Sequence, residues 1–281
     1  MDVNRVLDQV NEFPTLPTIY SALLDVIANP RSTVADVAKI IERDQSSAVK
    51  ILKAVNSSVY GLQVKVTTIS QAIFHLGFNE IKNLVITLSL VKIFSGINSV
   101  NSFNIVDFWK HSIAVGVITR LIGSVRGEKN IEDYFVSGII HDIGKLFFLK
   151  FFPKEYSEAV DDAFNKDITI RQSESGKFNA THNMVGDVIA KKWKLPVGIR
   201  NVITSHFSGM VNGKCESLVA TVHLANIISK IMKLGASGDK LVQQPNIQMW
   251  EALNLPANSI MSMMPRILSD YNQSASILSL K

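Results

Sequence analysis

The chain has 281 residues, of which 47% are hydrophobic and 19% are charged, and its mean hydropathy is +0.19. This composition excludes an intrinsically disordered chain and allows one or two domains with a sizeable buried core. The 29 basic and 24 acidic residues give a net charge of +5, but the basic residues are scattered, so nucleic-acid binding is not indicated.

The sequence predicts neither a membrane segment nor a secretion signal. No apolar run approaches the roughly 18 residues that are needed to span a bilayer. The best candidate, residues 84–91, lies between Lys82 and Lys92 and therefore predicts a buried helix. The first ten residues lack the apolar core of a signal peptide, so we expect a cytoplasmic protein. The single cysteine, Cys215, excludes an internal disulfide and a metal cluster held by thiolates.

Helical periodicity runs through almost the whole chain, and a clear helix start follows Ser32. Thr33 can cap this helix, and Asp36 completes a capping box. Apolar residues then recur at helical spacing and predict one buried face: Val34, Val37, Ile40 and Ile41. A second helix follows and ends near Asn56, before a turn at Tyr60-Gly61.

Residues 69–94 predict two further helices that are broken at Gly77, and the Gly-, Asn- and Ser-rich residues 95–104 predict a domain boundary. After this stretch, residues 108–123 are apolar nearly all round, which predicts a central helix. The sequence therefore predicts an all-α chain. Its expected parts are an N-terminal helical subdomain (residues 1–100), a helical bundle (residues 101–240) and a C-terminal helical extension (residues 241–281).

Five of the six histidines lie in the second part of the chain, each on a predicted helix beside apolar neighbours: His111, His141, His182, His206 and His223. Buried neutral imidazoles need partners, and several that lie close together form a natural cage for a divalent cation. A histidine taken alone is more often a hydrogen-bonded core residue. We prefer this interpretation for His223, whose neighbours suit simple packing.

The stretch SGIIHDIGKLFF, residues 137–148, places a histidine and an aspartate side by side in an apolar helix. On a helical wheel, His141 and Asp142 lie off the apolar arc and about 100° apart, so they offer a nitrogen and a carboxylate to one centre. Gly138, one turn earlier, leaves room for another helix to approach closely. We expect the helix to end at Gly144, which would place Lys145 at the mouth of the site, where it can neutralise a phosphate.

Two sets of residues together resemble a known family. The HDIGKL stretch resembles the metal-binding motif of the HD phosphohydrolase superfamily, and more closely that of its HD-GYP relatives. The first hundred residues instead resemble the front half of an HDOD domain, the HD-related output domain of bacterial signalling proteins. This resemblance spans residues 10–235, and its specific pieces are Leu16-Pro17, Asp44, Asn56-Ser57, Tyr60-Gly61, Ala72-Ile73, Leu76-Gly77 and WKHS at residues 109–112.

The resemblance implies an all-α fold in which an N-terminal helical subdomain packs on an HD-like bundle, and a regulatory role in bacterial signal transduction. It also implies a divalent metal (Fe, Mn, Ni or Zn), whereas no organic cofactor is indicated. By position, His111 matches the first histidine of the superfamily, and His141 and Asp142 match its HD pair. His182 and His206 resemble the additional histidines with which HD-GYP proteins hold further metals. Lys145 matches the lysine that meets substrate phosphate in active relatives.

The sequence departs from the active superfamily members at three points. Asn226 replaces the last aspartate ligand, and a neutral amide oxygen holds a hard divalent cation less well. Phe207 replaces the second histidine of an expected His-His pair, and no GYP motif follows His206. We therefore expect metal at His111, His141, Asp142, His182 and His206, with Asn226 as a weak ligand, but not efficient hydrolysis.

Three functional hypotheses follow. The favoured one is a non-catalytic signalling module that binds a partner protein or a small ligand and retains a metal. The alternative is a metal-dependent phosphohydrolase that acts on a nucleotide or a cyclic dinucleotide, with Lys145 as the phosphate contact. Nucleic-acid binding has only the net charge of +5 behind it.

Overall fold

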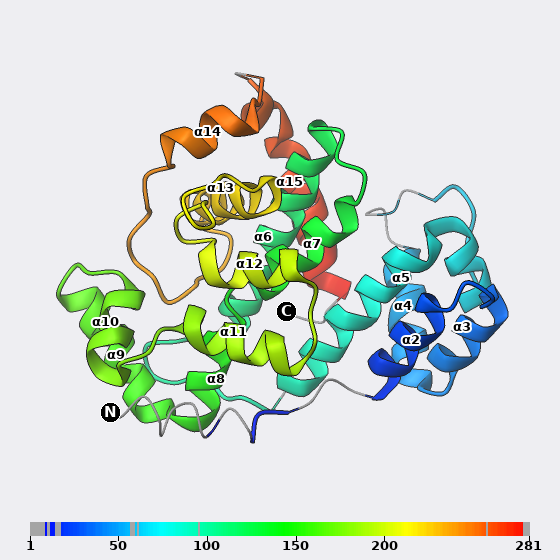
Figure 1. The fold of residues 1–281 in the computed structure, drawn as a ribbon, viewed down its shortest axis with the longest axis horizontal. Coiled ribbons are helices and arrows are strands. Elements are labelled where there is room, and N and C mark those ends of the chain that lie inside the picture. Colours follow the sequence, from blue (N-terminus) through cyan, green and yellow to red (C-terminus); the bar gives the residue numbers. More distant parts are fainter. Residues whose placement is uncertain are drawn as a thin grey trace. The chain divides into compact units, whose positions relative to one another are not determined.

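The all-α class predicted from the sequence is confirmed in the computed structural model of the chain (Figure 1). The structure describes residues 9, 12–14, 18–56, 60, 62–94, 96–256 and 258–277. Within these residues the only extended pairings are two isolated bridges, Val100 with Phe103 and Val211 with Lys214. No helix in the described part of the chain is long and apolar enough to cross a bilayer. Four residues singled out in the sequence, Leu16, Pro17, Ser57 and Gly61, lie outside the described residues.

The chain divides into two compact units. The larger unit contains Met1–Thr15 and Gly96–Ile267, and the smaller contains Leu16–Ser95 and Leu268–Lys281. The division into residues 1–100, 101–240 and 241–281 stays a prediction. α15 (Ser259–Ile277) has residues in both units.

The smaller unit is built from short, well-capped amphipathic helices. They are α2 (Thr18–Ala28), α3 (Val34–Glu42), α4 (Gln45–Val55) and α5 (Ile69–Phe94). The predicted capping box is confirmed, since Thr33 accepts a hydrogen bond from the Asp36 backbone and Asp36 accepts one from the Thr33 backbone. The predicted break at Gly77 is also confirmed, because this residue has a φ of 81° inside α5.

The larger unit holds the remaining helices. They are α6 (Ile105–Val125), α7 (Ile131–Ile140), α8 (Ile143–Phe151), α9 (Pro153–Asn165), α10 (Ile170–Phe178), α11 (His182–Lys192), α12 (Val197–Ser205), α13 (Ser217–Ile231) and α14 (Ile247–Leu253). α6 packs against both α7 and α13 (Figure 1), and it is buried nearly all round, as its sequence predicts. The close approach expected at Gly138 is confirmed, because a Cβ there would lie 2.5 Å from Cα of Gly116 on α6.

The HDIGKL stretch does not form one helix that ends at Gly144, so that prediction is wrong. α7 ends at Ile140 and α8 begins at Ile143, with His141 and Asp142 in the turn between them. Glycine is required at position 144 by packing, because a Cβ there would lie 2.0 Å from the carbonyl oxygen of His182. Because His141 and Asp142 lie in a turn, the separation of about 100° between successive residues of a helix does not apply to them.

Candidate metal centre

The turn between α7 and α8 brings His141 and Asp142 to the middle of a buried polar cluster. Three further histidines reach it from other helices: His111 from α6, His182 from the first turn of α11, and His206 from the end of α12. His206 is the C-cap residue of α12 and not an interior residue, contrary to the sequence-based expectation. All five side chains are at most 3% exposed.

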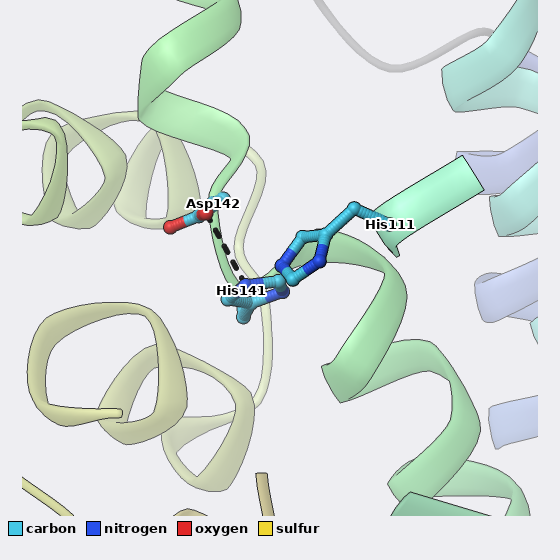
Figure 2. A group of neighbouring side chains, drawn as sticks. All are labelled: His111, His141 and Asp142. Carbon is cyan, nitrogen blue, oxygen red and sulfur yellow. Dashed lines mark ion pairs between the residues drawn. The ribbon is translucent and has the colours of Figure 1, made fainter. Parts of the chain in front are cut away.

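One group of possible ligands, which we call the enclosed group, consists of His111, His141 and Asp142 (Figure 2). Its ligand atoms all lie within 4.8 Å of one another, and Nε2 of His141 lies 3.3 Å from Oδ2 of Asp142. Nδ1 of His141 lies 2.7 Å from the carbonyl oxygen of Gly138, and Nδ1 of His111 lies 3.1 Å from Oγ of Ser229. Nδ1 of each ring therefore has a hydrogen-bond partner, whereas both Nε2 atoms lack one within the described residues.

A second group, which we call the cavity group, consists of Asp142, His182 and His206. Nε2 of His182 and Nε2 of His206 each lie 3.3 Å from Oδ1 of Asp142. Nδ1 of His182 lies 2.6 Å from a carboxylate oxygen of Glu174, and Nδ1 of His206 lies 3.1 Å from the carbonyl oxygen of Val202. Asp142 therefore belongs to both groups and presents a different oxygen to each.

The Nδ1 partners set the tautomers of three of the four histidines. A carbonyl or carboxylate oxygen can only accept, so His141, His182 and His206 must donate from Nδ1. A neutral imidazole that donates from Nδ1 carries a lone pair on Nε2. Each of these lone pairs then faces an oxygen of Asp142, which is also a hydrogen-bond acceptor. A cation bound between the nitrogen and oxygen acceptors would stabilise this arrangement. Metal-ligating histidines are held in the same way, by a carboxylate or carbonyl on the second nitrogen.

Glu174 is a site residue that the sequence did not reveal. Its side chain is fully buried, and it accepts hydrogen bonds from the backbone N–H of His182, from Nδ1 of His182 and from the hydroxyl of Tyr156. It lies in the helix Ile170–Phe178, which has no strong apolar pattern, so only the fold brings the carboxylate behind the ring. Ser229 was missed for the same reason, since it comes from the far end of α13.

The charged groups at the centre include the buried carboxylate of Asp142 and the buried ammonium of Lys145. Burial lowers the pKa of His206 to about 3, and burial also holds the pKa of His111 well below its ordinary value. Burial alone would raise the pKa of Asp142, but His141 and Lys145 outweigh it and hold that pKa well below the ordinary value. Asp142 is therefore ionised at neutral pH, as a metal ligand must be.

Lys145 is buried inside the cluster and does not lie at an exposed rim. Its Nζ lies 2.6 Å from Oδ2 of Asp142 and 2.9 Å from the carbonyl oxygen of Ser237. Burial lowers the pKa of Lys145, but the charge of Asp142 raises it by more. Lys145 thus already neutralises Asp142 on the side of the enclosed group, so a cation at that oxygen would compete with the ammonium.

The other residues predicted from the sequence divide between the centre and its surroundings. Asn226 is 9% exposed, its Oδ1 has no hydrogen-bond partner among the described residues, and it lines a cavity with Asp142, His182 and His206. His223 joins neither group of possible ligands, and its Nδ1 lies 2.7 Å from the carbonyl oxygen of His206.

These residues fit a divalent transition-metal ion. Among the possible ligands, four buried acceptor-capable atoms have no hydrogen-bond partner within the described residues: Nε2 of His111, Nε2 of His141, Oδ1 of Asp142 and Oδ1 of Asn226. Leaving such atoms unpaired in a protein interior costs about 1–3 kcal/mol each, and a metal ion satisfies several of them at once. Imidazole nitrogen with carboxylate oxygen is a donor set that suits Zn, Fe, Ni and Mn.

Comparisons with known proteins identify the family. Residues 13–208, well over half of the chain, match the model of the HDOD domain. The chain belongs to the HDOD domain family, as its sequence suggested. The crystal structure of an HDOD domain protein with unknown function from Geobacter sulfurreducens aligns with a TM-score of 0.82 at 25% identity, and the alignment covers 98% of this chain and 99% of that one.

Two further relatives are more distant. A crystal structure from Shewanella amazonensis SB2B, whose name proposes a metal-dependent phosphohydrolase, aligns with a TM-score of 0.68 at 19% identity, over 99% of this chain and 97% of that one. That likeness shows the fold alone. An uncharacterized protein of Treponema pallidum (strain Nichols) is 20% identical over 229 residues, which cover 81% of this chain and 44% of that protein. The chain spans less than half the length of the curated relatives that it matches.

Proposed function

We propose that the chain is a regulatory module of bacterial signal transduction that holds divalent metal in its helical bundle and acts by binding a partner protein or a small ligand. The observation that carries the metal part is the set of Nε2 lone pairs around Asp142, with a contact of 3.3 Å from each of His141, His182 and His206. The regulatory part is supported by membership of the HDOD family and by the resemblance of its first hundred residues to output domains.

Three features favour binding over catalysis. Asn226, in place of an aspartate, brings no negative charge to the cavity group. Lys145 is paired with Asp142 and with a backbone carbonyl, so its ammonium is not free to meet a substrate. The cavity over Asp142 has a volume of about 10 Å³, which is close to the space that one water molecule needs. A nucleotide does not fit there without movement of the side chains around it.

A metal-dependent phosphohydrolase that acts on a nucleotide or a cyclic dinucleotide is the second candidate. It is favoured by the buried ammonium of Lys145 beside the possible ligands, at the position of the phosphate-contacting lysine in active relatives. A divalent ion, when bound, lowers the pKa of a coordinated water and so supplies a hydroxide nucleophile.

Hydrolysis assays on protein of measured metal content separate the two functions. We expect no turnover of a cyclic dinucleotide or of bis-p-nitrophenyl phosphate above the level of the Asp142→Ala variant. Turnover that disappears in Asp142→Ala would overturn the non-catalytic part of the proposal. The Asn226→Asp variant is the positive control, because it restores the carboxylate found in the active superfamily; turnover in this variant alone would show that the missing charge disables the site.

A further inference from the structure

A group of aromatic side chains on α8 and α11 encloses one ring from the N-terminal segment. The ring of Phe13 is only 1% exposed. Its centroid lies 5.9 Å from that of Phe147 and 6.3 Å from that of Phe151, both on α8. It also stacks on Trp193, the C-cap residue of α11, at 5.8 Å between centroids. Because α8 and α11 pack side by side (Figure 1), the three side chains form one pocket, which we call the aromatic box.

Two side chains at the end of α11 bind the backbone of the same segment. Nζ of Lys192 donates a hydrogen bond of 2.7 Å to the carbonyl oxygen of Phe13. Nε1 of Trp193 donates one of 2.9 Å to the carbonyl oxygen of Pro14. Every peptide carries backbone carbonyl groups, so these two donors suit any segment that places successive carbonyls at the same spacing.

The residue types of the segment suit binding as a peptide. Proline narrows the conformations of the residue before it, and it has no N–H group that would need a partner. Phe13, which precedes Pro14, therefore loses little further conformational entropy when its ring is bound. Segments that contain proline bind aromatic-lined grooves by the same use of a preformed backbone.

Only the aromatic side chain of the segment is deeply inserted. Glu12 is exposed, and both Pro14 and the lysine that binds the first carbonyl, Lys192, are half-buried. One buried aromatic anchor with flanking residues at the surface is the arrangement found where a peptide binds a pocket. The segment is therefore bound as a peptide ligand is bound, by an anchor and two contacts to its backbone.

We propose that the aromatic box and Lys192 form a peptide-binding site, that the chain's own Phe13-Pro14 is its resident occupant, and that a partner protein binds by placing an aromatic residue followed by proline there instead. This inference deepens the proposed function, because it names the chemistry of the partner, and it rests on that function for the partner-binding role. The resident segment competes at an effective concentration on the order of millimolar, so a partner needs a tighter peptide or the release of that segment.

A labelled peptide with the sequence of residues 9–17 tests the site, and its binding to the 281-residue chain is measured by fluorescence anisotropy. Phe13→Ala removes the resident ring from the aromatic box. The matched control Phe164→Ala removes a ring from α9 that is 45% exposed, and it leaves the resident segment in place. We expect the peptide to bind Phe13→Ala at least about tenfold more tightly than it binds wild type or Phe164→Ala.

Two further substitutions in the Phe13→Ala background locate the bound peptide. Lys192→Met removes the donor to the first carbonyl and should weaken peptide binding by about 3- to 30-fold, because a hydrogen bond from a charged group is lost. The matched control Lys191→Met removes the neighbouring exposed ammonium from an ion pair with Asp187 and should leave the affinity unchanged. Equal affinities in these two double variants would contradict a site at the aromatic box.

Variants of the peptide test the ligand class. Alanine in place of phenylalanine should weaken binding by at least about tenfold, and alanine in place of proline should weaken it by about 2- to 5-fold. Equal binding of the peptides with and without proline would overturn the proposed ligand class. Absence of binding to Phe13→Ala, or equal binding of the peptides with and without phenylalanine, would overturn the site itself.

A second variant keeps the test decisive if Phe13→Ala does not fold, which circular dichroism and thermal unfolding would show. Phe13→Leu keeps an apolar side chain in the aromatic box, and we expect it to bind the peptide at least about threefold more tightly than wild type. An affinity equal to that of wild type would overturn the proposal.

The aromatic box and the metal centre can be tested separately. Asp142 directly precedes α8 and His182 begins α11, whereas Phe151 and Trp193 lie at the opposite ends of these helices. Metal content and hydrolysis are therefore measured on separate samples and decide the proposed function. Peptide binding by protein that holds no metal would support the peptide site while the metal part of the proposed function fails.

Discussion

The two groups that share Asp142 differ in their supports and in their access to the cavity. The enclosed group is held by Ser229 and by a backbone carbonyl, and its two histidines do not line the cavity over Asp142. The cavity group includes His182, which is held by the carboxylate of Glu174, and both of its histidines line that cavity. A carboxylate behind an imidazole makes the ring a stronger ligand.

This difference predicts that ions in the two groups would have different roles. The histidines of the enclosed group do not line the cavity, so the contribution of an ion in that group would be to stability. An ion in the cavity group would face Asn226 and the other residues that line the cavity, so its contribution would be to ligand binding. Substitutions on each side of Asp142 can break or sharpen this distinction.

The largest effect is expected at the residue that the groups share. Asp142→Ala should remove metal from both groups, because it deletes the only carboxylate that either contains. Elemental analysis of the variant checks this. Removing one partner of a buried ion pair costs about 3–5 kcal/mol, so the double variant Asp142→Ala/Lys145→Met serves as the control that folds without a buried unpaired ammonium. Metal retained in the double variant at the wild-type level would contradict a centre built on Asp142.

Single-histidine variants should separate the two groups. His111→Ala should remove the ion of the enclosed group and lower the melting temperature, whereas His206→Ala should remove the ion of the cavity group with a smaller change in melting temperature. Elemental analysis and thermal unfolding of both variants make the comparison. If the two variants lose the same amount of metal and of stability, the groups are not distinct.

The two groups should also differ in how strongly their metal affinity depends on the residue that contacts Nδ1 of a histidine ring. Glu174→Gln should weaken metal binding at the cavity group by about 10- to 100-fold, the usual cost of losing a carboxylate behind a ligating histidine. Ser229→Ala should weaken binding at the enclosed group by only about 2- to 10-fold, since a neutral hydrogen bond is lost. Competition with a chromophoric chelator measures both affinities. Glu158→Gln, which removes a half-exposed carboxylate from α9, is the matched control and should change neither affinity.

The smallest effect is a pH dependence of the metal-free protein. Burial lowers the pKa of His206 from 6.5 to about 3, so between these values the unfolded chain binds a proton that the folded chain does not. The stabilising contribution is therefore complete above pH 6.5 and is lost as the pH falls toward 3. Denaturant titrations at neutral pH and at about pH 5 should show a lower free energy of unfolding in acid, and a smaller pH effect in His206→Gln. An unchanged pH effect in that variant would assign the loss to other groups.

The sequence was sufficient for features that depend on neighbours along the chain. The capping box of Thr33 and Asp36 and the break at Gly77 are local, and both were predicted correctly. The burial of α6 all round follows from its apolar composition, which leaves no polar face for solvent. The five possible ligands were proposed from one local motif and from family resemblance, and the fold brings the four histidines close to Asp142.

The features that the sequence did not predict depend on contacts between distant segments. Gly144, two residues after the turn at His141 and Asp142, packs against the backbone of His182, a contact that no helical pattern contains. The pairing of Glu174 with His182 and the stacking of Arg171 on Phe207 likewise join segments that only the fold brings together. The polar residues around the centre are therefore brought together by tertiary structure, while its possible ligands were proposed from the sequence.

Elemental analysis of freshly purified protein tests the central claim most directly. The account predicts bound Fe, Mn, Ni or Zn, with one ion for each of the two groups, and predicts that a chelator removes the ion of the cavity group first. The fold is checked on the same sample by circular dichroism and thermal unfolding. Protein that is free of metal, does not take up metal when it is supplied, and keeps an unchanged fold and melting temperature would contradict the account.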